Sequence, residues 1–359
     1  MRSWMTRICI FAAIFAAFAN PVFAVDAVPV IYCTDLFHPH VDPDDHFDLA
    51  CLYAIGQLDL KVVILDQGRR QQERPGSVAI RQMNAITGRN IPWEIGLADP
   101  LANPEDTGAD QAKEYQGGVE RILKILADSD RPVSIITIGS VRDVAAAINR
   151  SPDLFRKKLG RLMIFIGEAS NPGFIEYNVS LDVQAFRRVM ESGLPIYWVP
   201  CFDGGLWQNR GKASYWTATQ AELLGEVSKR AMNYFIYALT HSKEDPILFL
   251  DRPITSEQAS GILGLDRNLW CTAIFGDLAD MRIWESNKRF YLADKEDNHG
   301  NPVELFRFED IQCSVDERGV VTTSPAGNLK IKRFQVLNEA TYPDIMTQVT
   351  ARLLASLGK

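Results

Sequence analysis

Residues 28–55 read VPVIYCTDLFHPHVDPDDHFDLACLYAI, and they are the most informative part of the chain for its fold. Residues 28–33 form an apolar run that predicts a buried strand, and apolar residues recur at helical spacing over residues 47–55. The turn between them contains four aspartates, Asp35, Asp42, Asp44 and Asp45. In open α/β sheets, ligands bind at such turns, at the carboxyl ends of the strands. We therefore expect a ligand site at this turn.

The crowding of these carboxylates favours a metal site. Anionic side chains this close repel one another unless a cation or protons intervene. Ca²⁺ is the most economical cation, because it is hard and prefers oxygen ligands. The alternative is that the aspartates only cap the helix that follows, a role for which Asp is a favoured residue. One aspartate would suffice for capping, so we favour the metal site.

The alternation of predicted strands and helices continues to about residue 200. Predicted strands cover residues 60–65, 91–97, 133–138, 162–166 and 194–200, and predicted helices cover residues 78–86, 117–127, 141–148 and 183–192. Repeated units of this length predict an α/β fold with a mostly parallel central sheet and helices on both faces.

The pattern changes after residue 220. Residues 221–239 predict one long amphipathic helix, and residues 344–357 predict a closing helix. Between them, residues 289–331 alternate charged and apolar side chains with glycine turns, which predicts a C-terminal antiparallel β excursion. Because no linker separates the two parts, we expect a single α/β domain over residues 25–359.

The first 24 residues predict a secretory signal peptide. Arg2 and Arg7 precede an apolar stretch over residues 8–19, and Val22-Phe23-Ala24 has the small-residue pattern of a cleavage site. The apolar stretch is shorter than the roughly 20 residues that a membrane-spanning helix needs. We therefore expect a protein without a membrane span that is exported to the periplasm or secreted.

The net charge of the chain limits the kinds of molecule that it is expected to bind. The net charge is −7, and removal of Arg2 and Arg7 with the signal peptide would make it −9. A chain this acidic is not expected to bind nucleic acid through phosphates; a small-molecule ligand fits better. The sequence leaves the oligomeric state open, with a homo-oligomer among the possibilities, and it does not pair the cysteines.

Two further segments have the composition of a binding site. Gly139-Ser140-Val141-Arg142-Asp143 follows a predicted strand, in a turn where backbone carbonyls become available to a cation. The polar loop over residues 165–182 contains Glu168, Ser170, Asn171, Glu176 and Asn178, whose side chains can hydrogen-bond sugar hydroxyls. The alternative for the loop is a solvated segment in which Asp182 caps the next helix.

In this order, the segments resemble the nucleoside hydrolase family, the inosine-uridine preferring enzymes that split the N-glycosidic bond of ribonucleosides. The stretch from Asp35 to Asp45 resembles the aspartate-rich signature of the family. Glu176-Tyr177-Asn178 and Asp182-Val183-Gln184-Ala185 resemble its Glu-Phe-Asn and Asp-Pro-x-Ala motifs, and residues 139–143 match a family turn in position. The resemblance covers roughly residues 28–203.

The resemblance implies a nucleoside-hydrolase-like fold and roles for particular residues. It makes Asp35, Asp45 and the backbone carbonyl of Ile138 ligands of Ca²⁺, and Asp44 a ligand of both the ion and a ribose hydroxyl. It assigns the ribose to Glu176 and Asn178, with Asn171 or Ser170 near its 5′ end. Asp35 would also be the general base that deprotonates a calcium-bound water.

Two departures from the family pattern matter. The turn is longer than in the family, so either Asp35 or Asp42 could take the general-base position, and His38 and His40 lie inside the insertion. The late His-Asp pair of the family is absent, because Asn268-Leu-Trp-Cys-Thr-Ala273 stands where chain order would put it. His241, before that segment, is either a substitute acid or a helix-terminal residue.

These observations lead to two function hypotheses. The first is a Ca²⁺-dependent hydrolase of a ribonucleoside or related riboside. The second is a divergent member that binds a ribose-containing ligand without turnover. Trp207, Trp216 and Trp270 either stack on that ligand or belong to the core.

Overall fold

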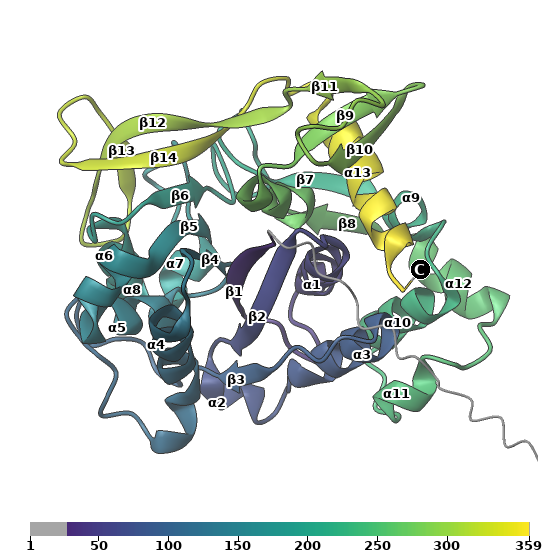
Figure 1. The fold of residues 1–359 in the computed structure, drawn as a ribbon, viewed down its shortest axis with the longest axis horizontal. Coiled ribbons are helices and arrows are strands. Elements are labelled where there is room, and N and C mark those ends of the chain that lie inside the picture. Colours follow the sequence, from purple (N-terminus) through teal and green to yellow (C-terminus); the bar gives the residue numbers. More distant parts are fainter. Residues whose placement is uncertain (1–26, 359) are drawn as a thin grey trace, which may run out of the picture.

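The computed structural model describes residues 27–358, and a nine-stranded sheet forms its centre (Figure 1). The predicted signal peptide, residues 1–24, lies outside the described residues. The strands of this sheet are β1 (Val28–Thr34), β2 (Leu58–Leu65), β3 (Trp93–Ile95), β4 (Val133–Thr137), β5 (Leu159–Phe165), β6 (Ile196–Val199), β12 (Phe306–Val315), β13 (Val321–Thr323) and β14 (Leu329–Val336). Their order across the sheet is β13-β12-β14-β6-β5-β4-β1-β2-β3.

The sheet is mostly parallel, which confirms the predicted fold class. All pairings from β14 through β6, β5, β4, β1 and β2 to β3 are parallel. Only β12 pairs antiparallel, with β13 and β14. The last part of the predicted β excursion therefore extends the central sheet through β14.

The chain reverses its direction of travel across the sheet at β1. It moves from β1 outward to β2 and β3, then returns to place β4 on the other side of β1. A crevice forms at such a switch point, outside the carboxyl ends of the two strands. Residues that follow β1 and β4 therefore face a common space.

Helices cover both faces of the sheet (Figure 1). They are α1 (Asp44–Ala54), α2 (Gly68–Gln71), α3 (Ser77–Thr87), α4 (Gly117–Asp128), α5 (Arg142–Arg150), α6 (Pro152–Lys158), α7 (Tyr177–Leu181), α8 (Val183–Met190), α9 (Gln220–Leu224), α10 (Lys229–Leu239), α11 (Pro246–Phe249), α12 (Ser256–Leu263) and α13 (Tyr342–Ser356), with 3₁₀ helices η1 (Lys113–Tyr115) and η2 (Thr272–Ala279). Alternate residues of β1 point to opposite faces of the sheet and pack into two separate hydrophobic cores. Ile31 and Cys33 pack with α4, α5 and α8, whereas Val30 and Tyr32 pack with α1, α3 and α13.

The prediction of one long helix over residues 221–239 is wrong. Thr219 begins α9 with a capping box to Glu222, and Ser228 begins α10 by accepting a hydrogen bond from Ala231 N. The helical periodicity continues across the break, but Gly225 and the Ser228 cap favour two short helices.

Two smaller sheets complete the second half of the chain. One consists of β9 (Arg282–Ser286), β10 (Arg289–Ala293) and β11 (Asn301–Val303), and the other of β7 (Trp216–Thr219) and β8 (Asp266–Leu269). Since β8 ends at Leu269, the next two residues, Trp270 and Cys271, lead toward the site described below. Within the described part of the chain, none of the helices has the length and apolar character needed to cross a bilayer.

Candidate active site

A cavity of about 340 Å³ lies at the carboxyl ends of the central strands, and we call it the aspartate cavity. Residues from the β1–α1 turn, the end of β4, the β5–α7 loop and the segments after β6 and β8 surround it. The lining residues are Asp35, Val41, Asp42, Asp44, Asp45, Ile138, Phe165, Glu176, Tyr177, Asn178, Cys201, Phe202, Leu206, Trp207, Trp270 and Cys271. The fold therefore brings together most of the residues that the sequence analysis assigned to a site.

Asp35 lies directly after β1, on the inner side of the cavity. Its Oδ2 accepts a hydrogen bond of 3.3 Å from Gln67 Nε2. Burial, the charge of Asp66 and, to a smaller extent, that of Glu176 raise the pKa of the Asp35 carboxyl to about 8. In the absence of a cation this group therefore prefers to hold a proton.

Asp44 and Asp45 lie in the first turn of α1. Asp45 Oδ1 accepts a hydrogen bond of 2.8 Å from Thr34 Oγ1, so its carboxylate turns back toward the end of β1. Burial raises the pKa of both carboxyls well above the ordinary value, and the charges of neighbouring aspartates, including Asp48, add to the shift. The N-cap position of α1 is Pro43, and no side chain caps the helix there. Asp42 Oδ1 accepts a long hydrogen bond of 3.4 Å from Asp44 N, so capping of the helix start accounts for Asp42 at most.

Asp35 and Asp42 occupy different environments. The side chain of Asp42 is 45% exposed, and its Oδ1 lies 3.6 Å from Arg267 Nη1. Asp35 instead lies near Glu176, whose charge adds to the rise in the pKa of Asp35, and near Asp45, whose own pKa the charge of Asp35 helps to raise. Of the two candidates for the general base, Asp42 is thus the one with a cationic partner at the mouth of the cavity.

Glu176, Asn178 and Ile138 form the wall opposite α1. Glu176 caps α7 and accepts hydrogen bonds from the backbone N–H groups of Gly167 (2.9 Å) and Asn178 (2.9 Å). Burial raises the pKa of Glu176, and these backbone donors oppose the shift. Asn178 Nδ2 donates to the carbonyl of Ile138 at 3.1 Å, which leaves that oxygen a second lone pair.

Asn171 is not among the residues that line the aspartate cavity. Its Oδ1 accepts a hydrogen bond from Gly173 N at 3.0 Å, within its own loop. The neighbouring Ser170 hydroxyl donates to Asp203 at 2.6 Å. In this conformation neither side chain turns toward the cavity, and the assignment of Asn171 to the ribose stays a prediction.

None of the histidines within residues 27–358 lines the aspartate cavity. His40 Nε2 and His241 Nε2 share a hydrogen bond of 2.9 Å, and His38 Nε2 bonds to the backbone oxygen of Ser242 at 2.7 Å. These contacts join the long β1–α1 turn to the end of α10. The histidines of the insertion therefore shape the loop.

Aromatic side chains form the outer part of the cavity. Trp207 is 45% exposed, and Trp270 packs nearby with its ring centroid 6.2 Å from that of Trp207. Trp270 Nε1 donates to Cys201 O at 3.1 Å, which holds its ring in place. Trp216 lies in the core with 2% of its surface exposed, so the core alternative holds for this tryptophan.

Two carboxylates near the site were missed by the sequence analysis. Asp66 directly follows β2, and it accepts hydrogen bonds from Ser140 N (2.7 Å) and Ser140 Oγ (2.8 Å), which fixes the turn after β4. Gly139 is needed in that turn, because a Cβ there would lie 2.6 Å from Asp66 Oδ2. Asp48 lies one turn into α1. The sequence contained a signal for each of them: Asp66 directly follows a predicted strand, and Asp48 lies at helical spacing from Asp44 and Asp45.

The donor set fits a hard cation. Asp35, Asp44, Asp45 and the Ile138 carbonyl offer only oxygen atoms, the ligands that Ca²⁺ prefers. None of the ion pairs formed within residues 27–358 includes Asp35, Asp44 or Asp45; Arg142 pairs with Asp66 and Asp182, and Arg267 pairs with Asp42. The charge of Arg70 acts on Asp35 without an ion pair. Over the same residues, no three His, Cys, Asp or Glu side chains are already arranged as a metal-binding group. Binding would therefore require carboxylates to turn toward the ion.

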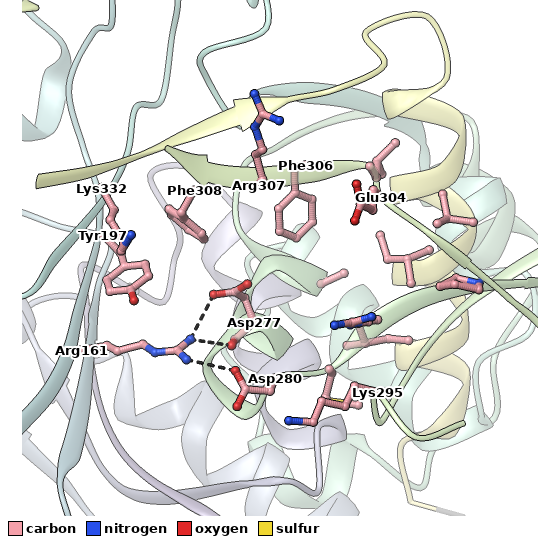
Figure 2. Close-up of a pocket in the computed structure, with 18 residues that line it drawn as sticks. Arg161, Tyr197, Asp277, Asp280, Lys295, Glu304, Phe306, Arg307, Phe308 and Lys332 are labelled. Atoms are coloured by element: carbon pink, nitrogen blue, oxygen red, sulfur yellow. Dashed lines mark hydrogen bonds and ion pairs between the residues drawn. The ribbon is translucent and has the colours of Figure 1, made fainter. Parts of the chain in front are cut away.

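A second and larger cavity, of about 900 Å³, lies elsewhere (Figure 2). Arg161 lines it near the start of β5, whereas Phe165, at the end of the same strand, lines the aspartate cavity. Figure 2 shows Arg161 extended toward Asp277 and Asp280, to which it is ion-paired at 3.2 and 3.0 Å. Because these charges are mutually paired, this cavity offers no comparable set of free carboxylates.

The sequence matches a known family over more than half of its length. Residues 38–246 match the family model described as inosine-uridine preferring nucleoside hydrolase. The pyrimidine-specific ribonucleoside hydrolase RihA of Enterobacter sp. (strain 638) is 29% identical in an alignment 192 residues long, which covers 47% of this chain and 58% of RihA. RihA of Escherichia coli O81 (strain ED1a) is 26% identical, with 47% and 59% covered. The chain thus matches less than two thirds of the length of these curated relatives.

Solved structures show the same fold at low sequence identity. An inosine-uridine preferring nucleoside hydrolase from Bacillus anthracis has a TM-score of 0.53 at 15% identity, with 92% of this chain and 99% of that chain covered. The plant nucleoside hydrolase PpNRh1 has a TM-score of 0.54 at 14% identity, with 90% and 99% covered. The effector protein XOO4466 has a TM-score of 0.51 at 13% identity, with 92% and 95% covered.

Proposed function

Because the chain belongs to the inosine-uridine preferring nucleoside hydrolase family, we propose that it hydrolyses the N-glycosidic bond of a ribonucleoside or related riboside with the help of Ca²⁺. The observation that carries the proposal is the convergence of Asp35, Asp44 and Asp45 on one cavity at a topological switch point. Burial of carboxylates that form no ion pair is energetically costly, and a bound metal ion would offset this cost by balancing their negative charge.

Asp35, Asp45 and the Ile138 carbonyl would hold the ion, with Asp44 between the ion and the sugar. A bound Ca²⁺ would make a coordinated water more acidic and orient it. Asp35 then accepts the proton from the attacking water, a role suited to a carboxylate on the inner side of the cavity. Asp44, Glu176 and Asn178 hold the ribose hydroxyls while the anomeric carbon gains oxocarbenium character.

The leaving group would lie against Trp207 and Trp270. Their ring faces suit a flat, aromatic base. No histidine within the described residues lines the cavity to protonate that base. We therefore expect the best substrates to be ribosides whose leaving group departs without protonation.

The missing histidine also favours a second candidate, a family member that binds a ribose-containing ligand without turnover. Its cavity would be the same, and so would its cation. The two candidates differ only in whether Asp35 has a reaction to catalyse.

Ribose release decides between them. Mature protein would be incubated with a panel of nucleosides and p-nitrophenyl riboside, with calcium or with a chelator. We expect calcium-dependent release that falls about 100-fold or more in Asp35→Asn, since a general base contributes roughly 10²–10⁴-fold. A larger loss of ribose release in Asp42→Asn than in Asp35→Asn would identify Asp42 as the general base. Asp143→Asn is the control for the loss of a buried carboxyl. No release from any substrate, beside stoichiometric calcium binding, would support the binder.

We also propose that the protein is exported. The charged, apolar and small-residue segments over residues 1–24 support this. The intact mass of the protein recovered from the periplasm or the medium tests it, with cleavage near Ala24 expected and an uncleaved cytoplasmic chain contradicting it.

A further inference from the structure

Asp48 is a buried carboxylate whose charge no described residue balances. Its side chain is 0% exposed. Oδ1 accepts a hydrogen bond of 2.9 Å from Thr272 N, and Oδ2 has no hydrogen-bond partner among the described residues. The thiol of Cys271, a weak donor, also interacts with this carboxylate. None of the ion pairs within residues 27–358 includes Asp48. Because an unpartnered buried carboxylate oxygen is costly, the site lacks a group that this oxygen would contact.

The position of Asp48 relates this oxygen to the aspartate cavity. Asp48 follows Asp45 by three residues and Asp44 by four in α1, a spacing that places all three on one face of the helix. Its hydrogen bond to Thr272 N ties it to the segment in which the preceding residue, Cys271, lines the cavity. Asp48 itself does not line the cavity, but its carboxylate joins α1 to the wall formed after β8.

That wall is where the chain departs from the family pattern. The sequence Trp270-Cys271-Thr272 stands where chain order would put the late aspartate. The wall itself therefore offers no carboxylate to the cation. The hydrogen bond from Thr272 N instead holds the carboxylate of Asp48 against this wall.

We propose that Asp48 Oδ2 is a further carboxylate ligand of the cation bound by Asp35 and Asp45, and that it supplies from α1 the ligand that the segment after β8 lacks. Oδ1 keeps its bond to Thr272 N and fixes the orientation of the carboxylate. The inference rests on the proposed function, because it assumes that this cavity binds the cation.

The first test is calcium binding by the mature protein, measured by titration calorimetry. We expect Asp48→Asn to weaken calcium binding by about tenfold or more, as loss of a supporting group at a metal site does. Asp143→Asn is the matched control, because Asp143 is also buried and also accepts a backbone N–H at 2.9 Å, from Leu97. This control should keep the wild-type affinity, and circular dichroism should show that both variants are folded.

The possible outcomes distinguish failure of the role of Asp48 from failure of the calcium-dependent function. Wild-type protein that binds no calcium would overturn the metal-dependent function itself. Calcium binding that Asp45→Asn abolishes and Asp48→Asn leaves within twofold would overturn only the role of Asp48. If Asp48→Asn does not fold, a crystal structure of the wild-type protein with calcium decides. Asp48 Oδ2 at about 2.3–2.6 Å from the ion is expected, and an ion that Asp48 does not contact refutes the inference.

Discussion

Thr34 Oγ1 donates a hydrogen bond of 2.8 Å to Asp45 Oδ1, and so joins the last residue of β1 to the first turn of α1. The same hydroxyl oxygen accepts a hydrogen bond of 3.1 Å from Leu36 N. One side chain thus fixes both the start of the long turn and the orientation of a carboxylate in the cavity. The contact joins two residues that are eleven positions apart in the sequence.

Thr34→Val should destabilise the protein, because it keeps the shape of the side chain but leaves Asp45 without its donor. We expect the free energy of unfolding to fall by roughly 1–3 kcal/mol, measured by urea denaturation in calcium-free buffer. Thr137→Val is the matched control: Thr137 is buried in β4, and its hydroxyl has no hydrogen-bond partner among the described residues. Equal losses in the two variants would show that the Thr34–Asp45 bond contributes nothing specific.

Trp207→Ala should weaken substrate binding without unfolding the protein. The indole is 45% exposed at the cavity mouth, and loss of base stacking is worth roughly 1–3 kcal/mol, so we expect KM or Kd to rise about tenfold. The measurement is nucleoside affinity beside thermal stability. Trp93→Ala is the control, since Trp93 is 37% exposed in β3 and does not line the cavity. An affinity unchanged in Trp207→Ala would remove this tryptophan from the site.

Asp143 should make stability depend on pH. Burial, followed by the charge of Asp66, raises the pKa of its carboxyl from 3.8 to about 7. The folded state therefore binds this proton more tightly than the unfolded chain does. The stabilising contribution is complete below about pH 4 and is lost as the pH rises toward 7.

Asp143→Asn cannot ionise and should remove this dependence. Relative to wild type, the variant should gain stability between pH 4 and pH 8, as urea denaturation at pH 4, 5, 6, 7 and 8 would show. Asp128→Asn, at an exposed position of α4, is the control for removal of a carboxyl that is not buried. A constant difference between Asp143→Asn and wild type would mean that Asp143 titrates alike in the folded and unfolded states.

Much of the fold was predictable from local patterns. The apolar run and the helical periodicity over residues 28–55 correspond to β1 and α1, because a buried strand and an amphipathic helix each leave a periodic signal. The break between α9 and α10 was missed, since the same apolar periodicity runs through Gly225 and only the Ser228 cap separates the helices. The positions of Asp42 and Asn171 relative to the cavity were not predictable, because loop side chains take their direction from tertiary contacts.

Strand, helix and motif signals are local, so they were enough to identify an α/β chain of the nucleoside hydrolase family with aspartates at the first strand-to-helix turn. Which carboxylates share one cavity depends instead on how distant parts of the chain pack together. Asp45 lies near Asp35 because Thr34, at the end of β1, holds the carboxylate of Asp45. Ile138 joins them because β4 is the neighbour of β1, while Arg267 pairs with Asp42. The tertiary structure also brought Thr272 against Asp48, across 224 residues of chain. The burial of a charge depends on which elements pack around it, and that packing is a property of the whole fold.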